Sequence, residues 1–99
     1  MQFEKDIERK LVAVVKKHHG LCLKWVCPGM SGVPDRIVLL PGEHIHFIEL
    51  KRPQGRPDKR QQWWANKLCS MGFAHYYVYD MDGIVAYATV LAVIDAERS

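Results

Sequence analysis

Glu49 and Lys51 have side-chain types and a spacing that suit catalysis. They end the apolar stretch HIHFIELK (44–51), and residues two apart on a β-strand point to the same face of the sheet. A second Glu-x-Lys triplet, from Glu8 to Lys10, lies in a stretch with helical periodicity, where residues two apart point to different sides. Only the first pair can therefore act together, as a carboxylate beside an ammonium group.

Asp35 brings a second carboxylate to the same place. It opens the apolar stretch DRIVLL (35–40), and a Pro-Gly turn separates this stretch from the one that ends in Glu49 and Lys51. The two stretches predict an antiparallel β-hairpin. Because the start of one hairpin strand lies beside the end of its partner, we expect Asp35 close to Glu49 and Lys51 at one end of the sheet.

Such a pair of carboxylates favours a divalent cation. Two adjacent carboxylates repel each other unless a proton or a cation lies between them. Oxygen atoms from Asp35, Glu49, the backbone carbonyl of Leu50 and waters suit the octahedral geometry of Mg²⁺ or Mn²⁺. With Lys51 beside them to orient a water or stabilise negative charge, these are the parts of metal-assisted phosphodiester hydrolysis. The residues alone leave one alternative open, a surface ion-pair cluster of little energetic value.

The rest of the sequence predicts the elements that position these residues. Apolar spacing, turn residues and Asp58 as a helix N-cap indicate the order α-β-β-β-α-β-α. The expected ranges are a helix at 2–19, strands at 21–27, 35–40 and 44–51, a helix from 58 to about 71, a strand at 73–80 and a helix after Asp82-Gly83. We therefore expect an α/β fold with a small mixed sheet flanked by helices, in a single domain covering residues 1–99.

Charge and cysteine content narrow the class of protein. The net charge is +3, and the three cysteines form no CxxC motif, so we expect a reducing cytoplasm and no disulfide framework. The charged start MQFEKDIERK is unlike a signal peptide, and no apolar stretch approaches the roughly 20 residues that span a bilayer. Basic residues gather in one short segment, as a solvated face or a phosphate-binding patch: Lys51, Arg52, Arg56, Lys59 and Arg60.

Three motifs together resemble a known family of enzymes. They are G-V-P-D (32–35), E-L-K (49–51) and Q-x-x-W-x-x-x-L-x-x-x-G (61–72). Each motif is weak alone, but the combination resembles the PD-(D/E)xK nucleases. More narrowly, it resembles the VRR-NUC (virus-type replication-repair nuclease) domain, over most of the chain from residue 8 to about residue 80.

The resemblance implies both a fold and the roles of several residues. The fold would be restriction-endonuclease-like, with Asp35 and Glu49 binding the metal and Lys51 serving catalysis. The family also has a glutamate on its first helix, which would hold a metal-bound water. Glu8 matches it best, and Glu4, one turn earlier, is the competing choice.

The family's downstream glutamine maps onto Gln61, whose spacing to Trp64 matches the motif. Asp58 and Gln61 also fit an N-capping box, and the two roles are compatible. Trp64 shares a helix face with Gln61 and is expected to pack in the core. The resemblance further suggests that Lys24 lies near the site. We expect DNA contacts from the basic residues Lys24, Arg52, Arg56, Lys59 and Arg60.

The resemblance implies a Mg²⁺- or Mn²⁺-dependent DNA endonuclease that leaves a 5′-phosphate and a 3′-hydroxyl. A chain of 99 residues has little surface for recognising DNA, so we expect a homodimer, whose two active sites would suit branched DNA such as a four-way junction. The alternatives are a flap or nicking nuclease of replication and repair, and a DNA-binding module that needs a partner protein. The small form is typical of a bacteriophage or prophage protein acting in the cytoplasm of a bacterial host.

Overall fold

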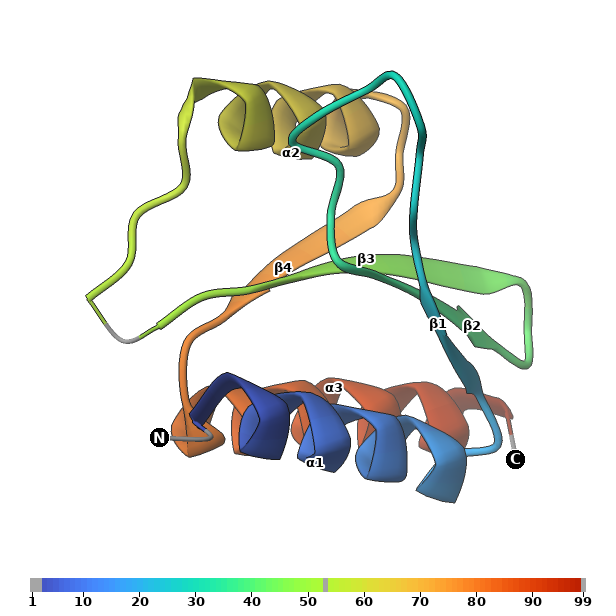
Figure 1. The fold of residues 1–99 in the computed structure, drawn as a ribbon. Coiled ribbons are helices and arrows are strands. Elements are labelled where there is room, and N and C mark those ends of the chain that lie inside the picture. Colours follow the sequence, from blue (N-terminus) through green and yellow to red (C-terminus); the bar gives the residue numbers. More distant parts are fainter. Residues whose placement is uncertain (1–2, 53, 99) are drawn as a thin grey trace.

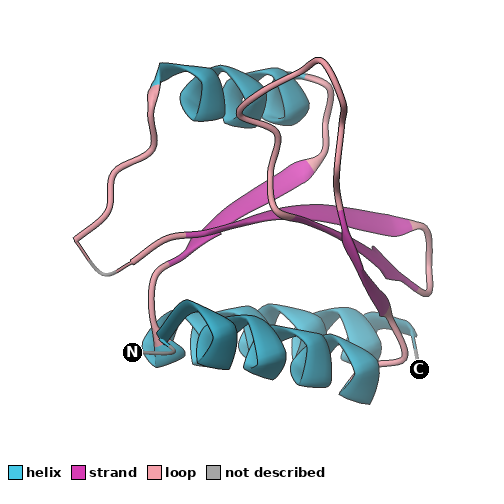
Figure 2. Ribbon diagram, in the orientation of Figure 1, coloured by secondary structure: helices cyan, strands magenta, loops and turns pink. Residues whose placement is uncertain are grey.

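The computed structural model describes residues 3–52 and 54–98, with side chains from Lys5 onward. Its elements are α1 (Phe3–Lys17), β1 (Leu21–Lys24), β2 (Arg36–Leu40), β3 (His44–Leu50), α2 (Lys59–Ser70), β4 (Ala74–Val78) and α3 (Met81–Arg98). The expected order of helices and strands is confirmed (Figure 2). Within the described ranges, none of the helices has both the length and the apolar character needed to cross a membrane.

The four strands form one mixed sheet in the order β1-β2-β3-β4. β1 pairs antiparallel with β2, and β2 antiparallel with β3, whereas β3 and β4 are parallel. α1 and α3 lie side by side against one face of the sheet, and α2 lies on the other (Figure 1). The parallel pair requires the chain to cross over between β3 and β4, and α2 is part of that connection.

The core lies between the sheet and the α1–α3 layer. Val38, Ile48 and Val78 face this layer from three strands and are almost fully buried. Leu11 of α1 and Leu91 of α3 pack against them from below the sheet. Burying each such side chain contributes about 1.5–3 kcal/mol, so this layer fixes the sheet on which the polar residues are mounted.

His46 is a polar member of this layer. It is only 4% exposed, and its Nδ1 atom forms a 2.9 Å hydrogen bond with the hydroxyl of Tyr87 on α3. Burial, together with the charge of neighbouring His44, lowers the pKa of His46 to about 4. The imidazole is therefore neutral at physiological pH and serves packing between the sheet and α3.

α2 is held on the opposite face by its first turn and by a tryptophan. The Asp58 carboxylate accepts a hydrogen bond from the backbone N–H of Gln61, and the Gln61 side chain accepts one from the Asp58 N–H, which completes a capping box. Trp64 meets Trp25 edge-on, with ring centres 5.6 Å apart, and donates its Nε1–H to the Ser31 carbonyl at 3.2 Å. Trp64 therefore packs, as expected.

β1 is shorter than expected and ends at Lys24 instead of residue 27. The chain turns just beyond it, where the Met30 N–H donates to the Cys27 carbonyl at 3.1 Å. Gly29 has a φ of +82° in this turn, a conformation that glycine adopts without steric cost. The turn therefore ends the strand.

α3 begins earlier than expected. We placed Asp82-Gly83 before the helix, but both residues lie in its first turn, since the helix starts at Met81. The Asp80 carboxylate accepts a hydrogen bond from the Gly83 N–H at 2.9 Å. Asp80 is thus the N-cap, and a sequence pattern that looks like a turn is the capped beginning of a helix.

Candidate active site

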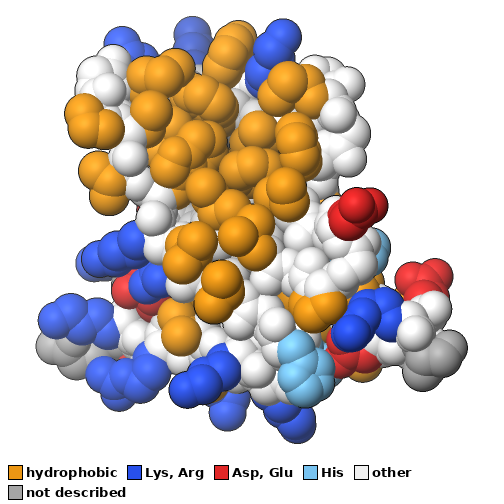
Figure 3. Space-filling model, turned by 90° about the vertical axis from the view of Figure 1, so that its right-hand side faces the viewer, with side chains coloured by type: hydrophobic (Ala, Val, Ile, Leu, Met, Phe, Trp, Pro, Cys, Tyr) orange, Lys and Arg blue, Asp and Glu red, His pale blue; other side chains and the backbone are white. Residues whose placement is uncertain are grey.

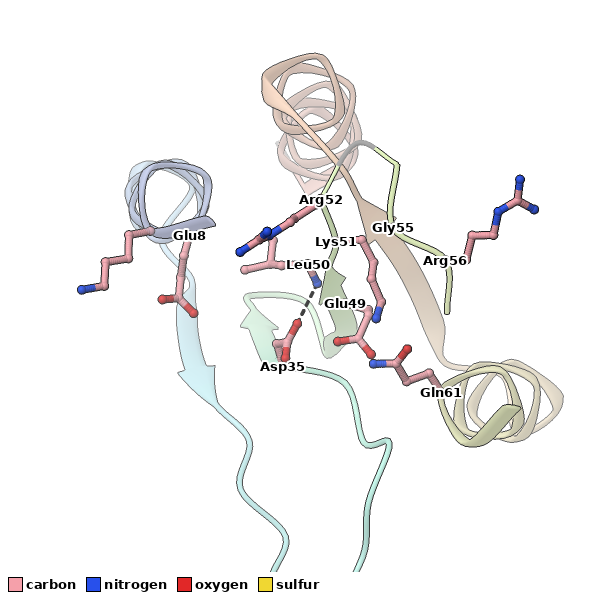
Figure 4. A pocket seen from close by; sticks show the side chains of 10 residues that line it. Glu8, Asp35, Glu49, Leu50, Lys51, Arg52, Gly55, Arg56 and Gln61 are labelled. Carbon is pink, nitrogen blue, oxygen red and sulfur yellow. Dashed lines mark hydrogen bonds between the residues drawn. The ribbon is translucent and has the colours of Figure 1, made fainter. Parts of the chain in front are cut away.

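A pocket of about 450 Å³ opens where the end of β3 faces the start of α2 and the first half of α1 (Figure 4). The candidates for catalysis and metal binding that line it are Glu8, Asp35, Glu49, Leu50, Lys51 and Gln61. They come from four separate segments of the chain. The fold therefore gathers the candidate residues, which are spread over more than half of the sequence, around one cavity.

Asp35 and Glu49 meet across the β2–β3 hairpin. Arg36 pairs with Ile48 in the antiparallel register, so the next step along the ladder places Asp35 opposite Glu49. The backbone N–H of Leu50 donates to the Asp35 carboxylate at 2.8 Å (Figure 4). This bond fixes the Asp35 side chain beside the end of β3, where directly opposed residues lie about 5 Å apart.

Glu49 is a buried acid, only 2% exposed. Burial, a hydrogen bond with the Asp35 side chain and repulsion by the Asp35 charge raise the pKa of Glu49 to about 9, against the smaller opposing effect of Lys51. At neutral pH without a cation, the two carboxyl groups therefore hold a proton between them. A divalent cation can replace that proton, because it compensates both carboxylates at once.

The oxygen atoms around this pair fit such a cation. The Lys51 N–H donates to the Val78 carbonyl of β4 at 2.9 Å. Peptide groups alternate in direction along a strand, so the N–H and C=O of Leu50 both face the Asp35 side. Asp35, Glu49 and the Leu50 carbonyl thus offer the all-oxygen donor set that hard divalent cations prefer. Among residues 3–52 and 54–98, no group of three or more His, Cys, Asp or Glu side chains could hold a metal, so no third carboxylate joins the pair.

Glu8 reaches the wall of the pocket but is held there by an arginine. Its carboxylate forms an ion pair with the Arg36 guanidinium at 3.2 Å, and Arg36 also donates to the Cys22 carbonyl at 3.2 Å. The side chain of Glu4, the competing choice, lies outside the described part of the structure. The sequence pattern did not single out Arg36. Arg36 and Asp35 are neighbours in the sequence, so on a strand their side chains point to opposite faces of the sheet. That alternation was the signal that could have placed Arg36 on the face that α1 covers.

Lys51 and Gln61 close the pocket on the α2 side. Both side chains point toward Glu49 (Figure 4). The Gln61 carbonyl oxygen takes part in the capping box with Asp58 at 3.0 Å, which leaves its amide nitrogen directed into the pocket. One residue thus fixes the start of α2 and presents a hydrogen-bond donor beside the buried acid.

The five basic candidates separate into two groups. Arg52 and Arg56 line the pocket, whereas Lys24, Lys59 and Arg60 do not. Arg60 donates to the Ser31 hydroxyl and so ties α2 to the 25–35 loop. Lys24 lies at the exposed end of the edge strand β1. The run of positive charge from Lys51 to Arg60 therefore places three residues at the cavity, Lys51, Arg52 and Arg56, and two, Lys59 and Arg60, outside its lining.

This chain is similar to known proteins, although no protein-family model matches the sequence. A protein named "Putative nuclease p44", from Acyrthosiphon pisum secondary endosymbiont phage 1, is 42% identical over 69 residues, which are 70% of this chain and 74% of that protein. A solved structure described as a VRR_NUC domain superposes with a TM-score of 0.80 and 25% identity, covering 84% of this chain and 90% of the other.

Proposed function

Because this chain belongs to the VRR_NUC nuclease family, we propose that it is a metal-dependent DNA endonuclease that cuts branched DNA as a homodimer. One observation supports the catalytic part above all others. Buried Glu49 faces Asp35 across the hairpin, and Lys51 points at Glu49 within the same pocket. A carboxyl pair that must share a proton, next to an ammonium group, is costly for folding and suited to cation-assisted hydrolysis.

The oxygen donors around Asp35 and Glu49 support a cation site there. Asp35, Glu49 and the Leu50 carbonyl would hold Mg²⁺ or Mn²⁺, which lowers the pKa of a bound water and neutralises phosphate charge. Lys51 then has two tasks that its position permits, orienting the attacking water and stabilising the negative charge that develops on the phosphate oxygens. Water forms a bond to phosphorus, the bond from phosphorus to O3′ breaks, and O3′ takes up a proton. The products are a 5′-phosphate and a 3′-hydroxyl.

Gln61 and Glu8 act from opposite walls of the pocket. The Gln61 amide nitrogen can donate a hydrogen bond to a water or phosphate oxygen beside Glu49. Glu8, which Arg36 holds at the other wall, can accept a hydrogen bond from a water in the cavity. Both residues position a water or a phosphate. The negative charge that develops during the reaction is stabilised by the cation and Lys51.

The substrate class follows from charge and family together. Arg52 and Arg56 place positive charge on the rim of the pocket that holds the Asp35–Glu49 carboxyl pair. Arginines in such positions bind backbone phosphates and carry no information on base sequence. The nuclease family and the phage origin of one relative indicate that the polyanion bound there is DNA, of the phage or of its host, in the bacterial cytoplasm.

The dimer is supported by an exposed apolar patch along the β1 side of the molecule. Figure 3 shows hydrophobic side chains gathered over much of one face. Leu21 and Leu23 of β1 share a sheet face with Ile45 through the register with β2, and all three are exposed, as are Val26 and Met30. Apolar patches of this kind mark interaction surfaces.

Cleavage of labelled DNA tests the proposal. Linear duplex, flap and four-way-junction substrates are incubated with Mg²⁺, Mn²⁺ or EDTA, beside the Lys51→Ala variant. We expect metal-dependent cutting that Lys51→Ala lowers about 100- to 1,000-fold, the usual cost of losing one charge-stabilising group. If the flap is cut faster than the four-way junction, the alternative of a flap nuclease replaces the junction-cutting enzyme. Binding without cutting would favour a DNA-binding module that needs a partner, and absence of both would refute the proposal.

A further inference from the structure

A second pocket, of about 820 Å³, adjoins the candidate active site across the segment that leads from β3 into α2. Its lining includes Arg56, Gln62 and Tyr79. Gly55 and Arg56 line both cavities. The two pockets therefore share a wall, and a ligand bound at the Asp35–Glu49 pair can continue into the second one.

The pairing of β3 with β4 places the ring of Tyr79 at the second pocket. Glu49 pairs with Tyr77 in the parallel register of β3 and β4. Tyr79 follows two residues later, and its ring centre lies 6.4 Å from that of Tyr77 at an interplanar angle of 34°. Residues two apart share a face of the sheet, so both rings lie on the side that carries Glu49. Tyr79 is half-exposed and contributes its free surface to the second pocket.

Two polar residues of this pocket suit the parts of a nucleotide that do not stack, namely a phosphate and the edge of the base. Figure 4 shows the Arg56 guanidinium pointing away from Asp35 and Glu49, so its charge is available to a phosphate one step along the strand. The Gln62 side chain donates its Nε2–H to the Pro57 carbonyl at 2.9 Å. This bond fixes the amide and leaves its carbonyl oxygen as an acceptor for a base edge.

We propose that the second pocket binds an unpaired nucleobase next to the phosphate being cut, stacked on the ring of Tyr79 and flanked by Arg56 and Gln62. The inference rests on the proposed nuclease function and adds what selects the substrate. A base inside a duplex has both faces covered by its neighbours and must leave the stack to enter such a pocket. The pocket therefore favours DNA whose base beside the scissile phosphate is unpaired, or unpairs more easily than inside a duplex, as at a branch point.

Stacking can be measured without cleavage. The Lys51→Ala protein is titrated with a branched DNA that carries fluorescent 2-aminopurine as the unpaired base beside the cut. We expect its emission to fall on binding, as it does when the base stacks on an aromatic ring. Adding Tyr79→Leu, which keeps an apolar side chain but has no ring, should remove the quenching and weaken binding about 5- to 150-fold, the contribution of one stacked base. Tyr79→Phe should retain both.

A matched control comes from an aromatic residue outside both pockets. Trp63 lies on α2 and is 55% exposed, so Trp63→Leu also removes an exposed aromatic ring, from the helix that covers the same face of the sheet. Quenching that survives in Trp63→Leu but not in Tyr79→Leu supports the pocket. The proposal is overturned if Tyr79→Leu quenches the emission as strongly as the Lys51→Ala protein with Tyr79 intact. It is also overturned if Tyr79→Leu and Trp63→Leu lose the quenching equally.

Cleavage gives an independent second readout. For enzyme with Lys51 intact, the ratio of kcat/KM between a substrate with the unpaired base and one with that base paired should fall in Tyr79→Leu and recover in Tyr79→Phe. An unchanged ratio contradicts the inference. If no DNA is cut by the wild type, the proposed nuclease function fails, and the quenching experiment still decides whether the pocket stacks a base.

Discussion

Asp35 and Glu49 share a hydrogen bond at the ends of two neighbouring strands, and only one of the two carboxyl groups can be ionised easily. Burial and the neighbouring acid hold the pKa of Glu49 at about 9. The folded, metal-free protein therefore binds a proton at neutral pH that its unfolded chain does not bind. This relationship links pH, metal and stability, and it leads to predictions that need no assay of activity.

The stability of the metal-free protein should fall with rising pH because of Glu49. Its pKa is raised in the folded state, from an ordinary value of 4.5 to about 9, so the stabilising contribution is complete below pH 4.5 and is lost as pH rises through 9. The slope is at most about 1.4 kcal/mol per pH unit. Urea unfolding in EDTA across this range should show the fall in wild type and a flatter profile in Glu49→Gln. Equal slopes would contradict it.

His46 should give the opposite dependence at lower pH. Its pKa is lowered from 6.5 to about 4 in the folded state, so its contribution is present above pH 6.5 and is lost as pH falls through 4. Between about pH 4.5 and 6.5 the effects of His46 and Glu49 therefore oppose each other. In His46→Phe only the effect of Glu49 remains. The free energy of unfolding of this variant should therefore fall as pH rises from 4.5, and between pH 4.5 and 6.5 it should fall more steeply than that of wild type. A variant that runs parallel to wild type would disprove this assignment.

Binding of Mg²⁺ should release a proton. The cation and the shared proton compete for Asp35 and Glu49, so affinity should rise with pH between 6 and 9 and approach tenfold per pH unit at full linkage. Calorimetry in two buffers of different ionisation enthalpy measures the released proton directly. Asp35→Asn should abolish binding, whereas Glu8→Gln should weaken it only slightly because Glu8 is paired with Arg36. Similar losses in both variants would mean that Glu8 is a direct ligand.

Gln61→Glu should separate the two roles of this residue. A glutamate keeps the capping box, because either residue serves at that position, so the melting temperature should change little. The carboxylate cannot donate a hydrogen bond into the pocket and adds charge beside Glu49, so we expect kcat to fall at least tenfold. Gln61→Ala provides the comparison, since it loses both roles and should also lose about 1 kcal/mol of stability. Full activity in Gln61→Glu would confine Gln61 to capping.

The apolar patch predicts a charge-sensitive dimer. Light scattering at micromolar concentration should give twice the monomer mass for wild type and the monomer mass for Val26→Asp, because a buried charge without a partner opposes association. Val85 on α3 is 65% exposed and lies outside the patch, so Val85→Asp is the matched control and should remain dimeric. A wild-type protein that is monomeric under these conditions would rule out the homodimer.

The hairpin end of the site was predictable because its rules are local. Alternation on β3 and antiparallel pairing after a Pro-Gly turn were enough to bring Asp35 beside Glu49 and Lys51. Likewise, the capping pattern at Asp58 and Gln61 located the start of α2. Each inference used a period or a turn that operates within a few residues, and the order of the elements followed in the same way.

Contacts between layers were not predictable from the same rules. The ion pair from Arg36 to Glu8 depends on how α1 packs on the sheet, and the bond from Arg60 to Ser31 depends on where α2 comes to rest. Long basic side chains reach several ångströms in any direction, so a charge run does not reveal which members face a cavity. Tyr79 was overlooked for a related reason, since its pocket forms only when β4 lies beside β3.

Between Lys51 and Asp58, the residues that the structure describes separate the two pockets and lie outside the regular helices and strands. Pairing of β3 with β4 and packing of α2 fix the two ends of this stretch but impose no length on it. Insertions or deletions there would move Arg56 relative to the Asp35–Glu49 pair without disturbing the core, as surface connections generally allow. Under the proposed function, a change in the length of this stretch would alter how far the cut lies from a branch point.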